Sequence, residues 1–480
     1  MRHLHIVNLL GRILVVLALV MLLSAIWALF EGGPDFYALG ISALITAAAG
    51  LLMRMFTPFR AEISLVESFA LVTLAWFVAG AFGALPYYFY GVFDSYLNAY
   101  FESISGFTTT GATLIEDIEA QPRGLLLWRS FTQWLGGMGI IVLFVALLPR
   151  LGFRGMNLFR AEMPGVFTDR VVPRIAEMAK RLWFIYVGFT GALMVLLMLV
   201  GVSFYNAISH ALTTMPTGGF SPLNDSIAGL ENPLAEIIII VFMLMAGINF
   251  ALYYQVLRRE YADFYRNPEL SFYLSLAAIS VVLVTINIGA HYELGESIRT
   301  GAFQVVSILT TTGYTTADFD AWPFFSKILL LLFMFLGGSG GSTSGSMKQV
   351  RIILLLKYAY REIYRIIHPA AFTKVKLGDR SVSDDILRNV IGFVIIYITA
   401  FALAVLALAG MGLDLETATS AVAATLGNVG PGLGGVGAEH TFQVVPPLGK
   451  GILCFMMVLG RLEIYTVLVF ILAEIRRDRI

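Results

Sequence analysis

The chain has 480 residues, of which 58% are hydrophobic and only 13% are charged, whereas soluble domains carry about 25% charged residues. This composition indicates an integral membrane protein and excludes an ordinary soluble domain. Its formal net charge of zero indicates nothing about partners, because the two signs are segregated along the chain, and a single cysteine, Cys454, excludes a disulfide framework.

Apolar segments long enough to cross a bilayer, about 20 residues each, recur along the chain in five pairs. The pairs are 8–30 with 36–56, 64–90 with 123–149, 180–202 with 234–258, 270–290 with 322–367, and 384–411 with 446–474. The first segment is too long for a signal-peptide core and lacks a cleavage site, so it is expected to be retained. The sequence therefore predicts an all-α membrane protein with about ten transmembrane helices.

Basic residues fix the expected orientation, because Lys and Arg collect in cytoplasmic connections. They are concentrated in the connections 150–181, 258–266 and 351–388 and in the C-terminal RRDR. Both termini are therefore predicted to be cytoplasmic.

The outward connections of the last four pairs share one pattern: a short amphipathic helix, then small hydroxyl or amide residues, then glycine. They read SYLNAYFESISGFTTTG (95–111), YNAISHALTTMPTGGFS (205–221), IRTGAFQVVSILTTTGYT (298–315) and LETATSAVAATLGNVGPG (415–432). Their turn glycines are spaced 108, 94 and 117 residues apart, which indicates one unit repeated four times. The sequence therefore predicts four re-entrant pore half-helices with fourfold pseudo-symmetry, in an arrangement resembling a potassium channel.

The repeats divide the chain into an N-terminal hairpin and four pore units. The expected boundaries are 1–60 for the hairpin, then 61–150, 151–260, 261–380 and 381–480 for the pore repeats, with a special loop at 337–347 in the third.

Irregular backbone at membrane depth is tolerated only where it is buried in protein or lines a water-filled cavity. Four turns around one axis could replace the water shell of a cation with backbone carbonyls, and the half-helices would aim their partially negative ends at it. In the second turn two adjacent glycines leave the register open. The expected cation-binding residues are Thr109, Thr110, Gly111, Thr217, Gly218, Gly219, Thr311, Thr312, Gly313, Asn428, Val429 and Gly430.

Acidic residues follow each of the four turns and would raise the local cation concentration at an outer mouth, or serve solubility alone. They are Glu116, Asp117, Glu119, Asp225, Glu231, Asp318, Asp320 and Glu439.

The span 322–367 is interrupted by LGGSGGSTSGSMK (336–348), and no other span is expected to be broken in this way. The stretch resembles a phosphate-binding loop but lacks its Gly-Lys-Ser/Thr ending. The interrupting residues are Gly337, Gly338, Ser339, Gly340, Gly341, Ser342, Thr343, Ser344 and Gly345.

Four motifs, TTTGAT (108–113), TGGFS (217–221), TTTGYTTADF (310–319) and LGNVGPGLG (426–434), resemble in that order the Trk/Ktr/HKT superfamily of potassium transporters. The extra N-terminal hairpin is similar to the TrkH branch. The resemblance implies that each turn supplies one quarter of a selectivity filter for K⁺. Some relatives carry Ser in the first turn and conduct sodium, so Gly111 favours potassium.

The resemblance also implies a gate below the filter, formed by the loop 337–345. It implies that Arg461 lies in the pore and hinders cations, although pairing with Glu463 or Glu102 is the alternative, and both arrangements could hold in different states. It further implies a homodimer with one pore per subunit and a cytosolic ring of TrkA-type subunits. ATP/ADP or NAD(H) is expected only on that ring; no enzyme activity, covalent cofactor or nucleic-acid partner is expected.

Two other classes compete with this interpretation. An inverted-repeat secondary transporter of an organic solute would also contain broken helices, but here every turn is expected on the same side. A membrane enzyme or receptor would need a catalytic cluster or a soluble domain, and the connections are too short for one.

Overall fold

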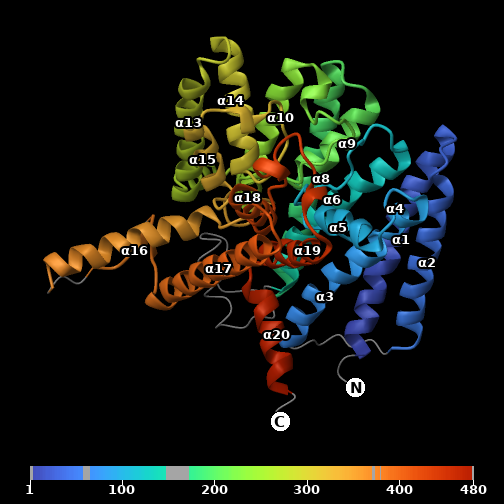
Figure 1. The fold of residues 1–480 in the computed structure, drawn as a ribbon. Coiled ribbons are helices and arrows are strands. Elements are labelled where there is room, and N and C mark those ends of the chain that lie inside the picture. Colours follow the sequence, from blue (N-terminus) through green and yellow to red (C-terminus); the bar gives the residue numbers. More distant parts are fainter. Residues whose placement is uncertain (1–3, 58–64, 148–171, 370–372, 379, 478–480) are drawn as a thin grey trace.

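The computed structural model describes residues 4–57, 65–147, 172–369, 373–378 and 380–477. The expected domain boundaries at 60/61 and 150/151 lie outside these residues. So do four basic residues of the connection 150–181, Arg150, Arg154, Arg160 and Arg170. The described chain is almost wholly helical (Figure 1).

Long apolar helices form the frame of the molecule. They are α1 (Leu4–Glu31), α2 (Phe36–Met55), α3 (Leu65–Gly83), α6 (Arg123–Leu147), α8 (Val172–Leu199), α13 (Pro268–Ile288) and α17 (Asp384–Gly410). In the described residues six helical segments are long and apolar enough to cross a membrane, one of them joining α3 to the short α4 (Leu85–Tyr90). Many of their apolar side chains are exposed, as is expected of a surface that faces lipid rather than water.

Two further spans are sharply bent, which the sequence did not predict. Helices α10 (Pro233–Ala246) and α11 (Phe250–Leu257) meet at 93°, and α19 (Pro447–Arg461) and α20 (Tyr465–Arg477) meet at 109°. Neither bend is an interruption by a Gly/Ser loop, so the expectation that a single span is interrupted in that way is not contradicted. With each bent pair taken as one span the described residues provide up to eight spans, so the count of ten stays a prediction.

The breaks have local causes. In the first, Asn249 accepts a hydrogen bond from Ala251 N and so caps the new helix α11. In the second, Glu463 and Ile464 both adopt left-handed backbone, with φ of 56°, a conformation that ends a right-handed helix. Neither break contains a run of glycine and serine.

The third interrupted span consists of α15 (Phe324–Phe333), the Gly/Ser loop (residues 337–345) and α16 (Gln349–Ile367). Figure 1 shows α16 extending away from the bundle beside α17. After α16 a two-stranded antiparallel hairpin, β1 (Lys376–Leu377) and β2 (Arg380–Ser381), is the described part's small departure from the all-α expectation.

Four short helices sit between the spans: α5 (Tyr96–Phe107), α9 (Phe204–Thr214), α14 (Leu294–Leu309) and α18 (Leu415–Leu426). Three begin at a side-chain cap, because Ser95, Ser203 and Asp414 accept backbone N–H groups of the first turn. The remaining short elements are α12 (Tyr261–Tyr265) and the 3-10 turns η1 (Ala228–Leu230), η2 (Phe319–Ala321), η3 (Gly434–Val436) and η4 (Phe442–Val444).

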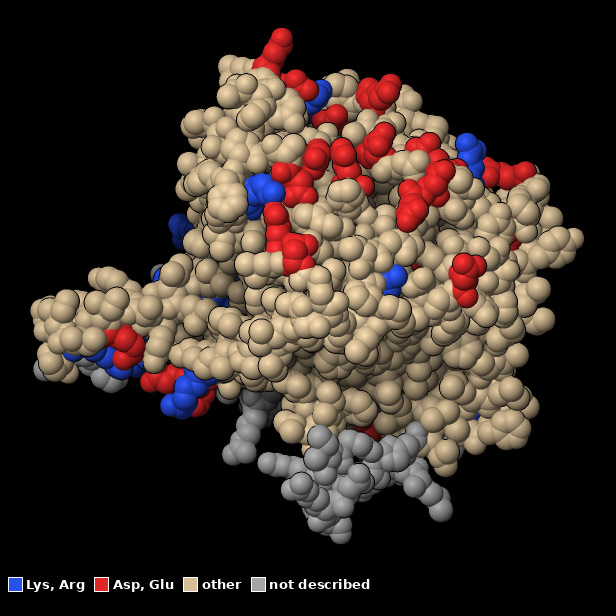
Figure 2. Space-filling view, viewed as in Figure 1, with Lys and Arg blue, Asp and Glu red and all other residues tan. Residues whose placement is uncertain are grey.

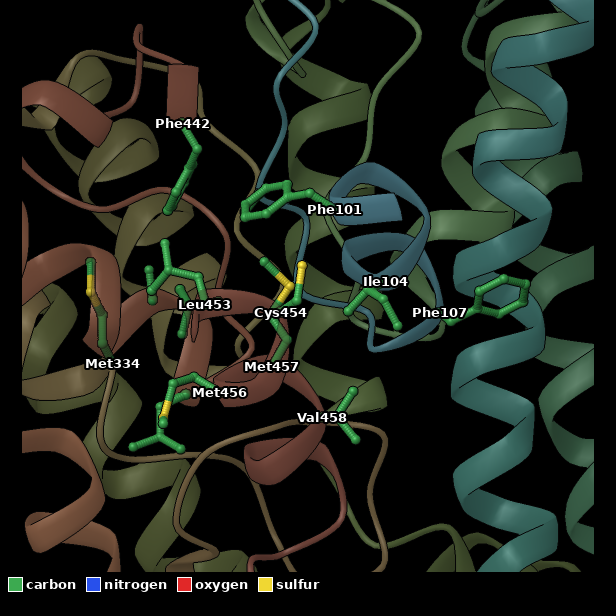
Figure 3. Close-up of a cluster of buried hydrophobic side chains, with 14 of the residues drawn as sticks. Phe101, Ile104, Phe107, Met334, Phe442, Leu453, Cys454, Met456, Met457 and Val458 are labelled. Atoms are coloured by element: carbon green, nitrogen blue, oxygen red, sulfur yellow. The ribbon is translucent and has the colours of Figure 1, made fainter. Parts of the chain in front are cut away.

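The short helices are buried against the surrounding spans. Figure 3 shows Phe101 and Ile104 of α5 facing Cys454 and Met457 of α19, within one continuous buried cluster. The lone cysteine is thus a packing residue. The start of α1 and the end of α20 lie on the same side of the molecule (Figure 1).

Candidate functional site

The turns after α5, α9, α14 and α18 share one backbone conformation. In each, a residue other than glycine takes a left-handed conformation, and a glycine with positive φ follows two positions later. The first set is Thr109, Thr217, Thr311 and Asn428, with φ of 52°, 58°, 58° and 54°; the second is Gly111, Gly219, Gly313 and Gly430, with φ of 84°, 79°, 79° and 105°. The second turn thus places Gly219, not Gly218, at the position of Gly111.

Backbone hydrogen bonds close each turn onto the end of its helix. The amide of the residue before the glycine donates to a carbonyl five residues earlier: Thr110 to Ser105, Gly218 to Thr213, Thr312 to Ser307 and Val429 to Ala424, at 2.8–2.9 Å. This is the Schellman pattern, which ends a helix through one left-handed residue. Each helix therefore stops at the turn, with its partially negative end beside the glycine.

The four turns contact one another in a closed ring. A Cβ atom added to the glycine of any turn would collide with a carbonyl oxygen of the next turn. From Gly111 it would lie 2.3 Å from Gly218 O, and from Gly219 it would lie 2.0 Å from Thr312 O. From Gly313 it would lie 1.8 Å from Val429 O, and from Gly430 it would lie 2.7 Å from Thr110 O, which closes the ring. No side chain fits at any of the four positions, so glycine is required by packing as well as by φ.

A cavity of about 80 Å³ opens directly above this ring, and all four ring glycines line it. The exposed acidic residues predicted for a mouth, among them Asp117, Glu119 and Asp225, follow the turns, while Asp318 and Asp320 are half-buried. Figure 2 shows acidic side chains gathered over the upper part of the molecule. Part of this charge has a structural role, since Asp320 pairs with Lys327 at 3.1 Å and accepts from Gly434 N.

A buried ion pair supports the first two turns, and it was not predicted from the sequence. Arg129 of α6 pairs with Glu102 of α5 at 2.8 Å, with 3% and 0% of the two side chains exposed. Arg129 also donates to Ser221 O and lies 3.4 Å from the centre of the Phe220 ring. Its signal was available in the sequence, because an arginine inside an apolar span is rare and needs a partner.

Further side chains hold individual turns. Gln133 donates to Gly218 O at 2.6 Å, so this carbonyl has one lone pair already engaged. Asn428 donates to Thr110 Oγ1 at 3.0 Å and so connects the fourth turn to the first. Tyr314 and Thr213 share a hydrogen bond at 2.5 Å between the third and second.

The Gly/Ser loop lies against the inner ends of three turns and is buried except for the half-buried Gly341. Gly345 N donates to Thr311 Oγ1 at 2.6 Å. Thr343 Oγ1 donates to Met215 O, at the end of α9, at 3.0 Å. Just after the loop, Ser346 Oγ donates to Gly427 O, at the end of α18, at 3.1 Å.

The opposite side of the loop contacts the bend between α10 and α11. Ser339 N donates to Gly247 O at 2.8 Å, and Phe250 N donates to Gly341 O at 3.1 Å. The loop therefore lies between the ring of turns and the broken helices, and several of its backbone groups are paired there, as buried backbone requires.

Arg461 lies at the bend between α19 and α20, 4% exposed, and its Nη1 donates to Thr343 O at 2.7 Å. The alternative pairing weighed from the sequence is not formed in this structure, where Glu102 pairs with Arg129 and Glu463 pairs with Arg351. The Nε and Nη2 groups of Arg461 have no hydrogen-bond partner among the described residues. The arginine thus connects the loop to the fourth repeat and leaves donors beneath the ring.

This arrangement has the chemistry of a cation path. Carbonyl oxygens at closely packed turns can replace water around a cation, and four helix ends add partial negative charge. A buried loop bonded to Arg461 lies below the turns.

Comparisons with known proteins agree with this geometry. The family model described as TrkH, cation transport protein, matches residues 38–480. The Trk system potassium uptake protein TrkH of Halomonas elongata is 39% identical over 470 residues, covering 97% of both chains. That of Escherichia coli K12 is 42% identical over 416 residues, covering 85% of this chain and 86% of the relative. The crystal structure of the potassium transporter TrkH from Vibrio parahaemolyticus superposes with a TM-score of 0.89 at 34% identity, covering 98% of both chains.

Proposed function

This chain belongs to the TrkH family of cation transport proteins, and we propose that it carries potassium into the cell through the ring of four turns. The observation that carries the proposal is the ring itself, in which four glycines pack against carbonyls of their neighbours. Potassium uptake is also the activity named for the relatives that match 97% and 85% of this chain.

In the proposed mechanism a partly dehydrated K⁺ enters from the cavity above the ring and is coordinated by turn carbonyls. The carbonyls of Thr110, Thr312 and Val429 are the main candidates, while Gly218 O contributes one lone pair beside its bond to Gln133. The residues expected to line the site are the twelve named from the sequence, from Thr109 to Gly430. The side chains of Thr and Asn at these positions act through their turn-stabilising bonds, such as that of Asn428 to Thr110.

The Gly/Ser loop serves as the gate below the ring. The position and the burial of the loop support this assignment, because the loop is hydrogen-bonded to Thr311, Met215 and Arg461 beneath the turns. Glycine and serine give this backbone the conformational range that a moving element needs. Arg461 holds the closed loop and places positive charge on the exit route, which disfavours a passing cation.

The remaining parts of the proposal concern assembly. The protein is a homodimer in the bacterial cytoplasmic membrane, with both termini in the cytoplasm. A cytosolic TrkA-type ring binds ATP/ADP or NAD(H) and acts on the gate through α16, which projects from the bundle (Figure 1). The division into an N-terminal hairpin and four pore repeats belongs to the same proposal.

The test is Rb⁺ and Na⁺ flux into proteoliposomes holding the purified chain, with and without a proton gradient. We expect Rb⁺ to enter in preference to Na⁺, and deletion within residues 338–345 to raise the flux measured without the cytosolic partner. Equal entry of Rb⁺ and Na⁺ would reject the filter, and a loop-deleted protein that stays closed would reject the gate.

A further inference from the structure

Glu269 is a buried carboxylate that the proposed ion path does not use. It stands at the start of α13, where Asn267 caps the helix by accepting from Glu269 N and Leu270 N. Only 1% of Glu269 is exposed. Burying a carboxylate is unfavourable unless partners compensate it, so its contacts carry information about its role.

One oxygen of Glu269 joins two elements that the gate proposal treats separately. Oε1 accepts from Gly340 N, in the middle of the Gly/Ser loop, at 2.7 Å. The same Oε1 accepts from Val350 N, in the first turn of α16, at 3.1 Å. The loop and the helix that follows it are therefore bonded to a single atom of a different transmembrane helix.

Both amides depend on this oxygen. The first N–H groups of a helix have no acceptor within it, so Val350 N needs an external one, and a negative charge at a helix N-terminus is favourable. Gly340 N belongs to irregular backbone at membrane depth, where water is excluded and an unpaired amide is unfavourable. Removing the carboxylate would leave two buried donors unsatisfied.

The adjacent residue anchors the same turn of α16 on its other side. Arg351 pairs with Glu463 at 2.5 Å, in the bend between α19 and α20. The start of α16 is thus fixed to α13 through Val350 and to the fourth repeat through Arg351. When α16 is displaced, either these contacts break or α13 and the fourth repeat move with it. Only then can the loop move out of its position below the ring.

We propose that Glu269 is a positioning residue that latches the Gly/Ser loop and the start of α16 together in the closed state. Opening requires the shared oxygen to release Gly340 and Val350, so movement of α16 and release of the loop occur as one event. This inference rests on the proposed function of the loop as a gate, and it assigns to a residue outside the loop the control of that gate.

The experiment compares Glu269→Ala, Glu269→Gln and a matched control, Glu236→Gln, in proteoliposomes without the cytosolic partner. Glu236 of α10 is also buried, at 7% exposure, and its ion pair with Arg299 at 3.2 Å does not involve the loop. The parent chain and the variant deleted within residues 338–345 are measured beside them. Thermal unfolding in detergent establishes that each variant is folded.

We expect Glu269→Ala to raise Rb⁺ flux by roughly a hundredfold, because two hydrogen bonds to a charged acceptor are lost. Glu269→Gln keeps an acceptor oxygen of the same reach and should raise flux less, whereas Glu236→Gln should leave it unchanged. A rise in flux at an unchanged ratio of Rb⁺ to Na⁺ flux separates latching from a general loss of structure, which would also disturb the filter.

The failures are distinguishable. If the loop deletion raises flux and both Glu269 variants behave like the parent, the latch is rejected and the gate remains. If Glu236→Gln raises flux as much as the Glu269 variants do, the effect is unspecific and the latch is also rejected. If neither the parent nor the loop deletion carries Rb⁺, the proposed function itself fails.

Discussion

Arg461 and Thr343 are joined across 118 residues of sequence by a hydrogen bond of 2.7 Å between a guanidinium Nη1 and a loop carbonyl. Both residues are buried, at 4% and 0% exposure. The contact places the positive charge of Arg461, from the fourth repeat, directly against the Gly/Ser loop of the third repeat.

Replacing Arg461 by Ala should therefore increase cation flux. The change removes a hydrogen bond from a charged donor, worth about 1.5–3 kcal/mol, and removes a positive charge from the exit route. We expect Rb⁺ flux without the cytosolic partner to rise by roughly tenfold. Arg299→Ala is the control, since Arg299 of α14 pairs with Glu236 of α10 at 3.2 Å, an ion pair that involves neither the loop nor α16, with 31% of its side chain exposed. If the flux of Arg461→Ala is unchanged, Arg461 has a purely structural role and does not restrict the passage of cations.

Gly111→Ser should weaken the preference for K⁺ over Na⁺. Its Cβ would lie 2.3 Å from Gly218 O, so the second turn must shift and its carbonyl moves. We expect the ratio of Rb⁺ to Na⁺ flux to fall by roughly tenfold, or ~1.4 kcal/mol.

Gly91→Ser provides the control for Gly111→Ser. Gly91 has nearly the same φ, 85°, but no atom lies within 4 Å of the point where its Cβ would stand. Both variants then carry a backbone strain of about 1–2 kcal/mol. Only Gly111→Ser also displaces the carbonyl of Gly218. If both variants lose selectivity equally, the ring contact is not its cause.

Thr311→Val should destabilise the closed loop, because Gly345 N loses its acceptor Thr311 Oγ1. An unsatisfied buried amide costs about 1–3 kcal/mol, while Val keeps the shape of the side chain. The comparison is Thr109→Val, at a residue with similar φ whose hydroxyl has no hydrogen-bond partner among the described residues. We expect partner-independent Rb⁺ flux to be higher in Thr311→Val than in Thr109→Val, and equal flux would contradict a bond between loop and filter.

Arg129→Met should destabilise the whole protein, since it leaves the carboxylate of Glu102 buried without its partner. Breaking a buried pair from one side costs about 3–5 kcal/mol, which thermal unfolding in detergent would detect. The double variant Glu102→Gln with Arg129→Met should recover most of the loss.

The control for the Arg129 prediction is Arg123→Met. Arg123 pairs with Glu31 at 3.3 Å with 62% of its side chain exposed, and such surface pairs contribute about 0–1 kcal/mol. A similar loss of stability in both variants would mean that burial does not determine the effect.

Local patterns predicted the turns well. The Thr-Gly and Asn-Val-Gly segments combine residues that end helices with residues that tolerate positive φ, and the four end in the same backbone conformation. The Gly/Ser loop was also located correctly, because nothing else explains such a stretch between apolar segments. Family membership and potassium uptake are supported by the comparisons.

What the sequence could not provide were contacts between distant segments. The bends at 247–249 and 462–464 contain no run of glycine and serine, and their local causes, the cap at Asn249 and the two left-handed residues after α19, look like ordinary helix ends in the sequence. The partner of Arg461 was missed for a related reason: a carboxylate was sought, and the acceptor is a backbone carbonyl of a loop 118 residues away. The role of Gln133 at Gly218 likewise depends on packing across 85 residues.

The ring of glycines has a rotational sense. The first turn abuts the second, the second the third, the third the fourth and the fourth the first, each glycine meeting the carbonyl of its successor. A bulky residue in one turn therefore displaces the next turn directly. The previous turn is displaced only if the shift is passed on through the other two turns of the ring. Compensating substitutions should accordingly be found in the successor of an altered turn. Because the four turns lie on one polypeptide, each can diverge separately, and each constrains the divergence of the one that follows.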